Sequence, residues 1–136
     1  MEFIDTVKEL CSAYAPSGFE HIIANKVKGI LSPLCDDVYI DRLNSVIGIK
    51  KCGKPGAKTI VLDAHLDQIG FIVTGISDEG FLRVASIGGV DERMLPACDV
   101  IVLGDPALRG VFTSIPPHLQ TSDSADKSIP LNELFI

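Results

Sequence analysis

The spacing of hydrophobic residues predicts two amphipathic helices at the start of the chain. Over 2–14 they recur every three or four positions, which is typical of a helix with one buried face. Pro16 ends this run, because the residue before a proline disfavours helical geometry. Ser17, with Glu20 three residues later, matches a capping box and opens a second periodic run that ends near Pro33. We therefore expect helices over 2–14 and from Ser17 to about Pro33.

Short hydrophobic runs without a helical period follow and predict three strands. They cover residues 37–41, 45–50 and 59–64. A connection at 42–44 and a Gly/Pro-rich turn at 53–56 bracket the second run. Two helices followed by three strands suit the edge of an α/β domain.

The pattern changes after Gly70, where the hydrophobic runs become shorter and are separated by Gly, Asp and Pro turns. Short strands at this spacing are typical of a small barrel or sandwich. The polar residues 119–130 predict a mobile loop. We therefore divide the chain into 1–68 and 69–136. The expected strands of the second part are 71–74, 81–84, 100–103 and 110–113.

Composition excludes several classes of protein. The 136 residues are 46% hydrophobic with a net charge of −6, which suits a globular chain large enough for one ordinary core. No Lys/Arg cluster favours nucleic acid, and no run approaches the ~18–20 apolar residues that span a membrane. The N-terminus lacks the basic and apolar run of a secretory signal. The four cysteines are scattered, which predicts reduced thiols rather than a zinc knuckle. We expect a cytoplasmic protein without nucleic-acid or membrane partners.

The candidate chemistry lies at the end of the expected strand 59–64, where His65 and Asp67 form a His-x-Asp pair. Side chains two apart on a strand share a face, so both point the same way. A neutral imidazole is a good zinc or cobalt ligand, and a neighbouring carboxylate can fix its tautomer. Taken alone, the pair is better explained as two polar residues at a strand end, since short motifs often occur by chance.

Five landmarks along the chain together resemble the glutamyl/deblocking aminopeptidase family. This is the dinuclear-metal exopeptidase family that includes tetrahedral aminopeptidases and proteins once labelled cellulase or endoglucanase. The match keeps the family's order and approximate spacing over essentially the whole chain. Two departures are Asn44-Ser45, where the family commonly has Gly-Asn, and Gln68, where it commonly has Glu. The landmarks are 15–20 (APSGFE), 41–45 (DRLNS), 64–71 (AHLDQIGF), 87–91 (IGGVD) and 115–119 (IPPHL).

The resemblance implies a fold and an activity. Residues 1–68 would open an α/β catalytic domain, and 69–136 would be part of an inserted β-barrel that mediates homo-oligomer assembly. The chain would be an N-terminal portion of a longer enzyme. That enzyme would remove N-terminal residues from peptide substrates with water activated by two divalent metal ions, with zinc or cobalt as the expected metals. His65 would be a metal ligand and Asp67 the carboxylate that orients it.

The remaining ligands and the general base of the family match no residue of this chain. We expect His21 to be a solvated surface residue and His118 to be part of a loop. Two functions stay open: a metallo-aminopeptidase whose activity this portion lacks alone, and a non-catalytic folded fragment that serves oligomerisation. An unrelated β-rich binding module accounts for neither the helices nor the landmarks. Metal identity and substrate preference also stay open.

Overall fold

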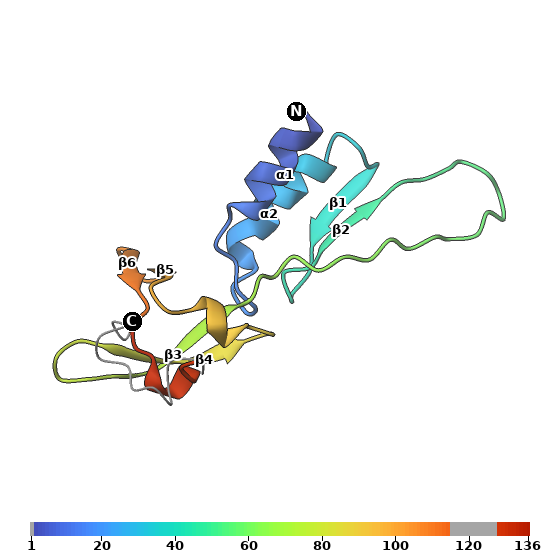
Figure 1. Cartoon of the computed structure of the whole chain (residues 1–136). Helices are drawn as coiled ribbons and strands as arrows, with labels where there is room; N and C mark the ends of the chain where they lie inside the picture. The colour runs from blue at the N-terminus through green and yellow to red at the C-terminus, as the bar shows by residue number, and fades with distance from the viewer. Residues whose placement is uncertain (1, 115–127) are drawn as a thin grey trace. The chain divides into compact units, whose positions relative to one another are not determined.

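The computed structural model describes residues 2–114 and 128–136. The chain divides into two compact units, Met1–Gln68 and Ile69–Ile136 (Figure 1). It is a mixed α/β protein, as the sequence predicts. The landmark 115–119 with His118, and the expected loop up to residue 127, lie outside the described residues. Whether the units are the opening of a catalytic domain and an inserted barrel stays a prediction.

Both expected helices form in the first unit, each shorter than the pattern suggested. Helix α1 spans Phe3–Cys11 and helix α2 spans His21–Leu31. The prediction that Ser17 caps α2 is wrong. The N-cap position is Glu20, without a side-chain cap, because a turn closed by a hydrogen bond from Phe19 N to Pro16 O (2.8 Å) delays the start of the helix.

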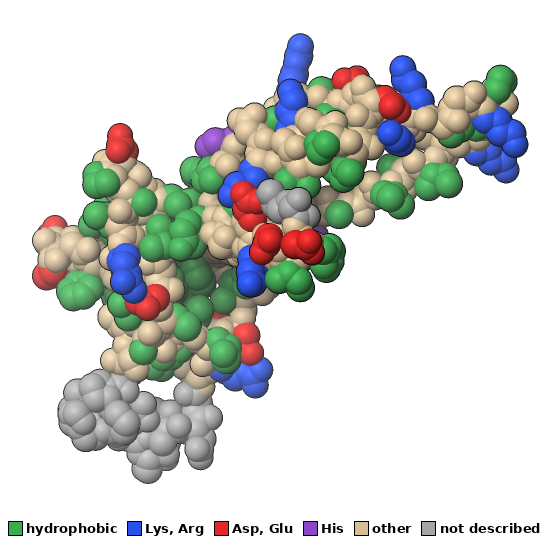
Figure 2. Space-filling view, turned by 90° about the horizontal axis from the view of Figure 1, so that it is seen from above, with side chains coloured by type: hydrophobic (Ala, Val, Ile, Leu, Met, Phe, Trp, Pro, Cys, Tyr) green, Lys and Arg blue, Asp and Glu red, His purple; other side chains and the backbone are tan. Residues whose placement is uncertain are grey.

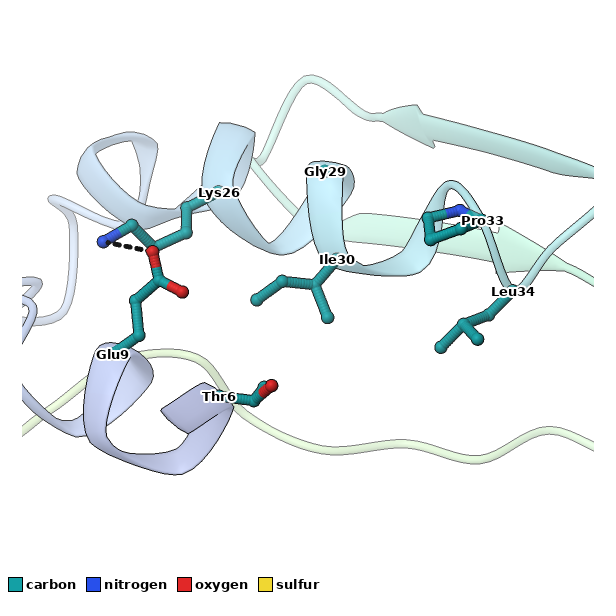
Figure 3. Close-up of a pocket in the computed structure, with 7 residues that line it drawn as sticks. All are labelled: Thr6, Glu9, Lys26, Gly29, Ile30, Pro33 and Leu34. Carbon is teal, nitrogen blue, oxygen red and sulfur yellow. Dashed lines mark ion pairs between the residues drawn. The ribbon is translucent and has the colours of Figure 1, made fainter. Parts of the chain in front are cut away.

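The two helices lie side by side and bury little of their surface. Glu9 on α1 and Lys26 on α2 form an ion pair with a 3.2 Å N–O distance across a shallow groove (Figure 3). Both side chains are partly exposed, so the pair adds at most about 1 kcal/mol. Ile23 and Ala24 are the buried residues of α2. The other side of α2 contacts strands β1 (Asp37–Ile40) and β2 (Val46–Ile49).

Strands β1 and β2 lie where the sequence predicts strands, and they form an antiparallel hairpin in register from Asp37 opposite Ile49 to Ile40 opposite Val46. Asp41 organises the turn. Its Oδ1 accepts hydrogen bonds from the backbone N–H groups of Leu43 (2.8 Å) and Ser45 (2.9 Å). This is the Asx-type bonding that makes Asp a frequent turn residue.

The expected strand 59–64 is not a strand. Ile60, Val61 and Leu62 leave 84%, 79% and 94% of their surfaces exposed. No strand of the described part of the chain pairs with this segment. A hydrophobic run becomes a strand only when another strand satisfies its backbone groups and covers its side chains. The run is therefore an extended segment without a partner within the described ranges.

The described residues of the second unit contain four strands, each overlapping a predicted range. Strands β3 (Gly70–Ile76) and β4 (Leu82–Ile87) form one antiparallel hairpin, and β5 (Asp99–Val102) and β6 (Leu108–Val111) form another. Short 3-10 helices lie at Glu92–Met94 (η1) and Leu131–Glu133 (η3). The described residues form separate two-stranded sheets, so the closed barrel stays a prediction.

The core of the second unit gathers side chains from distant segments. Phe112 is nearly completely buried and meets Phe71 edge-on, with ring centroids 5.0 Å apart. Ile136 joins the edge of β4 by exchanging two backbone hydrogen bonds with Leu82, of 2.8 and 3.0 Å. A Cβ atom on Gly110 would lie 2.5 Å from Ile136 Cγ2, so a glycine is required there for this approach. The buried residues of the core are Val84, Leu95, Phe112 and Leu134.

Large hydrophobic side chains reach the surface on both units (Figure 2). Phe3 and Ile4 are exposed on α1, and Ile76, Met94 and Leu108 are exposed in the second unit. Patches of this kind commonly mark surfaces that contact other protein. Among the helices of residues 2–114 and 128–136, none is long and apolar enough to cross a bilayer.

Candidate metal-ligand site

The turn before α2 holds the segment that carries His65 and Asp67. Gln68 N donates a 2.9 Å hydrogen bond to Ala15 O, and Pro16 and Gln68 form an isolated parallel bridge. The landmarks 15–20 and 64–71, far apart in sequence, therefore meet in one place. These contacts fix the backbone at Asp67 although the expected strand is absent.

Asp67 links His65 to Ser17. Its Oδ2 accepts a 2.5 Å hydrogen bond from Ser17 Oγ, and its Oδ1 lies 3.2 Å from His65 Nδ1. His65 Nδ1 also lies 2.9 Å from the backbone oxygen of Asp67. Both partners of Nδ1 are acceptors, so Nδ1 carries the proton and donates. The other ring nitrogen, Nε2, is then the one with a free lone pair.

The charge of the site is set by Asp67. The hydroxyl of Ser17, which donates to the carboxylate, holds the pKa of Asp67 below its usual range, and the nearby His65 lowers it further. Partial desolvation opposes this shift without reversing it. Asp67 is therefore ionised at neutral pH and acts only as an acceptor, which is the form that keeps a proton on His65 Nδ1.

The donor set fits one ligand of a metal ion together with its support. A metal-ligating histidine usually donates its other ring N–H to a carboxylate or a carbonyl, as His65 does to both. The His65 side chain is 85% exposed, so its Nε2 is accessible. Within residues 2–114 and 128–136, no three His, Cys, Asp or Glu side chains gather as a metal site would require. The described residues thus offer one candidate ligand, His65, and not a complete coordination shell.

Other candidate residues do not join this site. His21 begins α2 at the surface, with its ring centroid 5.9 Å from that of Phe19. The carboxylate of Asp91 is engaged by the Arg93 guanidinium, with a shortest N–O distance of 2.6 Å. The groove between α1 and α2 in Figure 3 is lined by neither His65 nor Asp67. These groups have local structural roles.

Ser17 is the site residue that sequence reasoning missed, because the capping-box pattern offered a local explanation for it. Its hydroxyl instead bonds to a residue 50 positions away. The signal that could have found it is its place inside the 15–20 landmark.

Comparison with known proteins gives one family. The family model described as M42 glutamyl aminopeptidase matches residues 44–136. The lysyl aminopeptidase of Pyrococcus furiosus is 36% identical over 118 residues, covering 85% of this chain and 33% of its own length. The chain therefore spans about a third of that relative.

Two solved structures of peptidases are also similar to this chain. An aminopeptidase, APDkam598, from the archaeon Desulfurococcus kamchatkensis superimposes with a TM-score of 0.85 at 39% identity, covering 97% of this chain and 36% of that one. The TET1 peptidase of Pyrococcus horikoshii, described as assembling into a tetrahedron or a large octahedral shell, gives a TM-score of 0.82 at 31% identity. That match covers 98% of this chain and 39% of the other.

Proposed function

The chain belongs to the M42 glutamyl aminopeptidase family, and from that premise we propose that it supplies one metal ligand and its support to a metal-dependent aminopeptidase. The observation that carries the proposal is the hydrogen bonding of His65, whose Nδ1–H is held by Asp67 while Nε2 stays accessible. The reaction would remove N-terminal residues from peptides. This chain covers about a third of the length of its aminopeptidase relatives. The activity is therefore proposed for a complete enzyme that contains these residues.

We assign His65 as a ligand through Nε2, and Asp67 as the carboxylate that fixes the tautomer and orientation of His65. Divalent metal ions, two in a complete site and zinc or cobalt by preference, would supply a water of lowered pKa as the nucleophile. In this proposal His65 binds a metal ion and Asp67 orients the His65 ring. Among positions 2–114 and 128–136, no group of three or more His, Cys, Asp or Glu side chains gathers to complete a metal site.

We propose that the second unit, Ile69–Ile136, is part of a β-barrel through which copies of the protein assemble. Its two hairpins and its exposed Ile76, Met94 and Leu108 are consistent with a surface that packs against another chain. The tetrahedron and the octahedral shell described for the TET1 peptidase, to which this chain is similar, support this proposal. We also place the protein in the cytoplasm, because all four cysteines are free thiols, as in a reducing compartment.

A second candidate function is a non-catalytic folded module that serves assembly. It is favoured by one observation: no group of three metal-binding side chains forms within the described ranges. The reading frame beyond codon 136 separates the two candidates. Further Asp and Glu-Glu landmarks of the family in that frame would favour the enzyme, and a stop codon would favour the module.

The direct test uses the complete reading frame that contains these residues. We expect hydrolysis of aminoacyl p-nitroanilides with added zinc or cobalt, and its loss with a chelator. His65→Ala should lower the rate by more than the 10–100-fold typical of losing a partner that only supports a ligand. The matched control is His21→Ala, an exposed histidine in the same unit, which should leave the rate unchanged. Full activity in His65→Ala, or activity that survives metal removal, would refute the assignment.

A further inference from the structure

The hydroxyl of Ser17 connects the turn before α2 to the His65–Asp67 pair. We propose that Ser17 is a positioning residue for His65: it holds one oxygen of Asp67 so that the other keeps the His65 proton on Nδ1. Nε2 is then left free for a metal ion. This inference rests on the proposed function, because it concerns how the assigned ligand is oriented.

The two oxygens of Asp67 have separate partners, which is what this role requires. Oδ2 lies 2.5 Å from Ser17 Oγ, and Oδ1 lies 3.2 Å from His65 Nδ1. The terminal torsion of an Asp side chain has broad, shallow preferences, so a carboxylate with one free oxygen rotates easily. Holding Oδ2 sets the plane of the carboxylate and therefore the position of Oδ1.

The same turn also holds the backbone of this segment. Gln68 N donates to Ala15 O at 2.9 Å, and Pro16 bridges to Gln68. The main chain next to Asp67 and the side chain of Asp67 are thus both fixed by residues 15–17. The fixed main chain positions Asp67 O, which lies 2.9 Å from His65 Nδ1. The fixed side chain positions Asp67 Oδ1, the other acceptor of the Nδ1 proton.

The alternative is that Ser17 only stabilises its own turn. The structure gives its hydroxyl no local role, because α2 begins at His21 without a side-chain cap. The Ser17 Oγ hydrogen bond reaches 50 residues along the chain instead. A purely structural serine would change the stability of the first unit but not the position of the proton on the His65 ring.

The test reads that proton directly in the 136-residue chain without metal. Two-bond 1H–15N spectra distinguish the two neutral imidazole tautomers at about pH 9, where histidines are uncharged. We expect His65 to be the Nδ1–H tautomer in the wild type and a mixture in Ser17→Ala, with Ser17→Thr restoring the wild-type pattern. The matched control is Ser32→Ala, which removes a hydroxyl that donates only to Lys28 O, and should leave His65 unchanged.

A titration with inorganic Zn²⁺, followed by the His65 signals, provides a second readout. Asp67→Asn should weaken binding at His65 about 10–100-fold, as is typical when the partner of a ligand is lost. Ser17→Ala acts one bond further away and should weaken it about 3–10-fold, at or below the lower end of that range. Ser17→Thr and Ser32→Ala should bind as the wild type does.

The outcomes separate this inference from the proposed function. If Asp67→Asn changes the His65 tautomer and Ser17→Ala does not, the role of Ser17 is refuted and that of Asp67 stands. If neither changes it, the role of Asp67 in the proposed function is refuted as well. Should Ser17→Ala lose the dispersed amide signals of a folded first unit, Ser17→Val and Ser17→Thr, which have the same shape, give the comparison. Equal tautomer patterns in those two would also refute the inference.

Discussion

Replacing Gly110 with alanine tests how closely Ile136 approaches β6. The new Cβ would lie 2.5 Å from Ile136 Cγ2 and 3.3 Å from Val100 Cγ2. Carbon atoms in contact prefer about 3.5–4.0 Å, so the overlap with Ile136 is about 1 Å or more. Cγ2 is attached directly to Cβ, and it can retreat only if χ1 rotates or if the backbone moves away from its two hydrogen bonds with Leu82.

The expected cost follows from these terms. A side chain forced off its rotamer costs about 0.5–1.5 kcal/mol, and overpacking as a whole typically costs about 1–3 kcal/mol. Alanine recovers about 0.5–1 kcal/mol relative to glycine inside a strand, because it restricts the unfolded chain. We therefore expect Gly110→Ala to destabilise the second unit by about 1–2 kcal/mol, a large share of the stability of a small domain.

The assay must report on the second unit alone. The chain has no tryptophan, and both tyrosines, Tyr14 and Tyr39, lie in the first unit. Native-state hydrogen exchange of the β5 and β6 amides meets the requirement. Gly75→Ala is the matched control, since a Cβ at this position in β3 meets nothing within 4 Å.

A double-mutant cycle identifies the cause. Ile136→Ala removes Cγ2, so Gly110→Ala should cost at least about 1 kcal/mol less in that background than in the wild type. A penalty for Gly110→Ala no larger than that for Gly75→Ala would contradict the close approach. A penalty that persists unchanged in Ile136→Ala would show that the clash lies elsewhere.

Three further expectations follow from the described contacts. The guanidinium of Arg93, together with its backbone N–H, lowers the pKa of Asp91 to about 2, so their hydrogen bonds should persist above the ordinary pKa of 3.8 and be lost as pH falls toward 2. Arg93→Gln removes the larger of these two causes and should raise the midpoint of the Asp91 carboxyl 13C titration part of the way toward 3.8; an unmoved midpoint would contradict this. The 136-residue chain should bind Zn²⁺ only weakly and show no aminopeptidase turnover, because the described residues provide one ligand; tight stoichiometric binding by calorimetry that His65→Ala abolishes would show a fuller site. The exposed residues 60–62 and the hydrophobic surface of the second unit should make the chain self-associate, and a clean monomer by light scattering over a wide concentration range would refute this.

Local patterns predicted the elements whose partners are close in sequence. The strands of the hairpins β1–β2 and β3–β4 were predicted because hydrophobic runs and turn residues are patterns that act over a few positions. The run 59–64 has the composition of a strand, but composition cannot supply the neighbouring strand that would make it one. A strand requires a second segment to pair with, and the hydrophobic pattern of 59–64 does not show whether such a segment exists.

The candidate site was predicted in part for the same reason. His65 and Asp67 are two residues apart, and their contact is local. The roles proposed for them come from the family resemblance and remain proposals. Ser17 was assigned to a cap because a capping box is a local pattern, whereas its actual partner is distant. Sequence reasoning therefore finds a contact between residues close in sequence, such as His65 and Asp67, more readily than one between distant residues, such as Ser17 and Asp67.

The contact between Ser17 and Asp67 also has a consequence for the order of folding. It closes a loop of 50 residues, for which chain entropy costs about 3.5 kcal/mol by the (3/2)RT ln n relation. The β1–β2 hairpin lies inside this loop and can form on its own in microseconds, which shortens the remaining flexible path. The hairpin should therefore favour the Ser17–Asp67 contact by lowering the entropy cost of closing the loop. The imidazole, which lies beside Asp67, is then a reporter for the closing of this loop during the folding of the first unit.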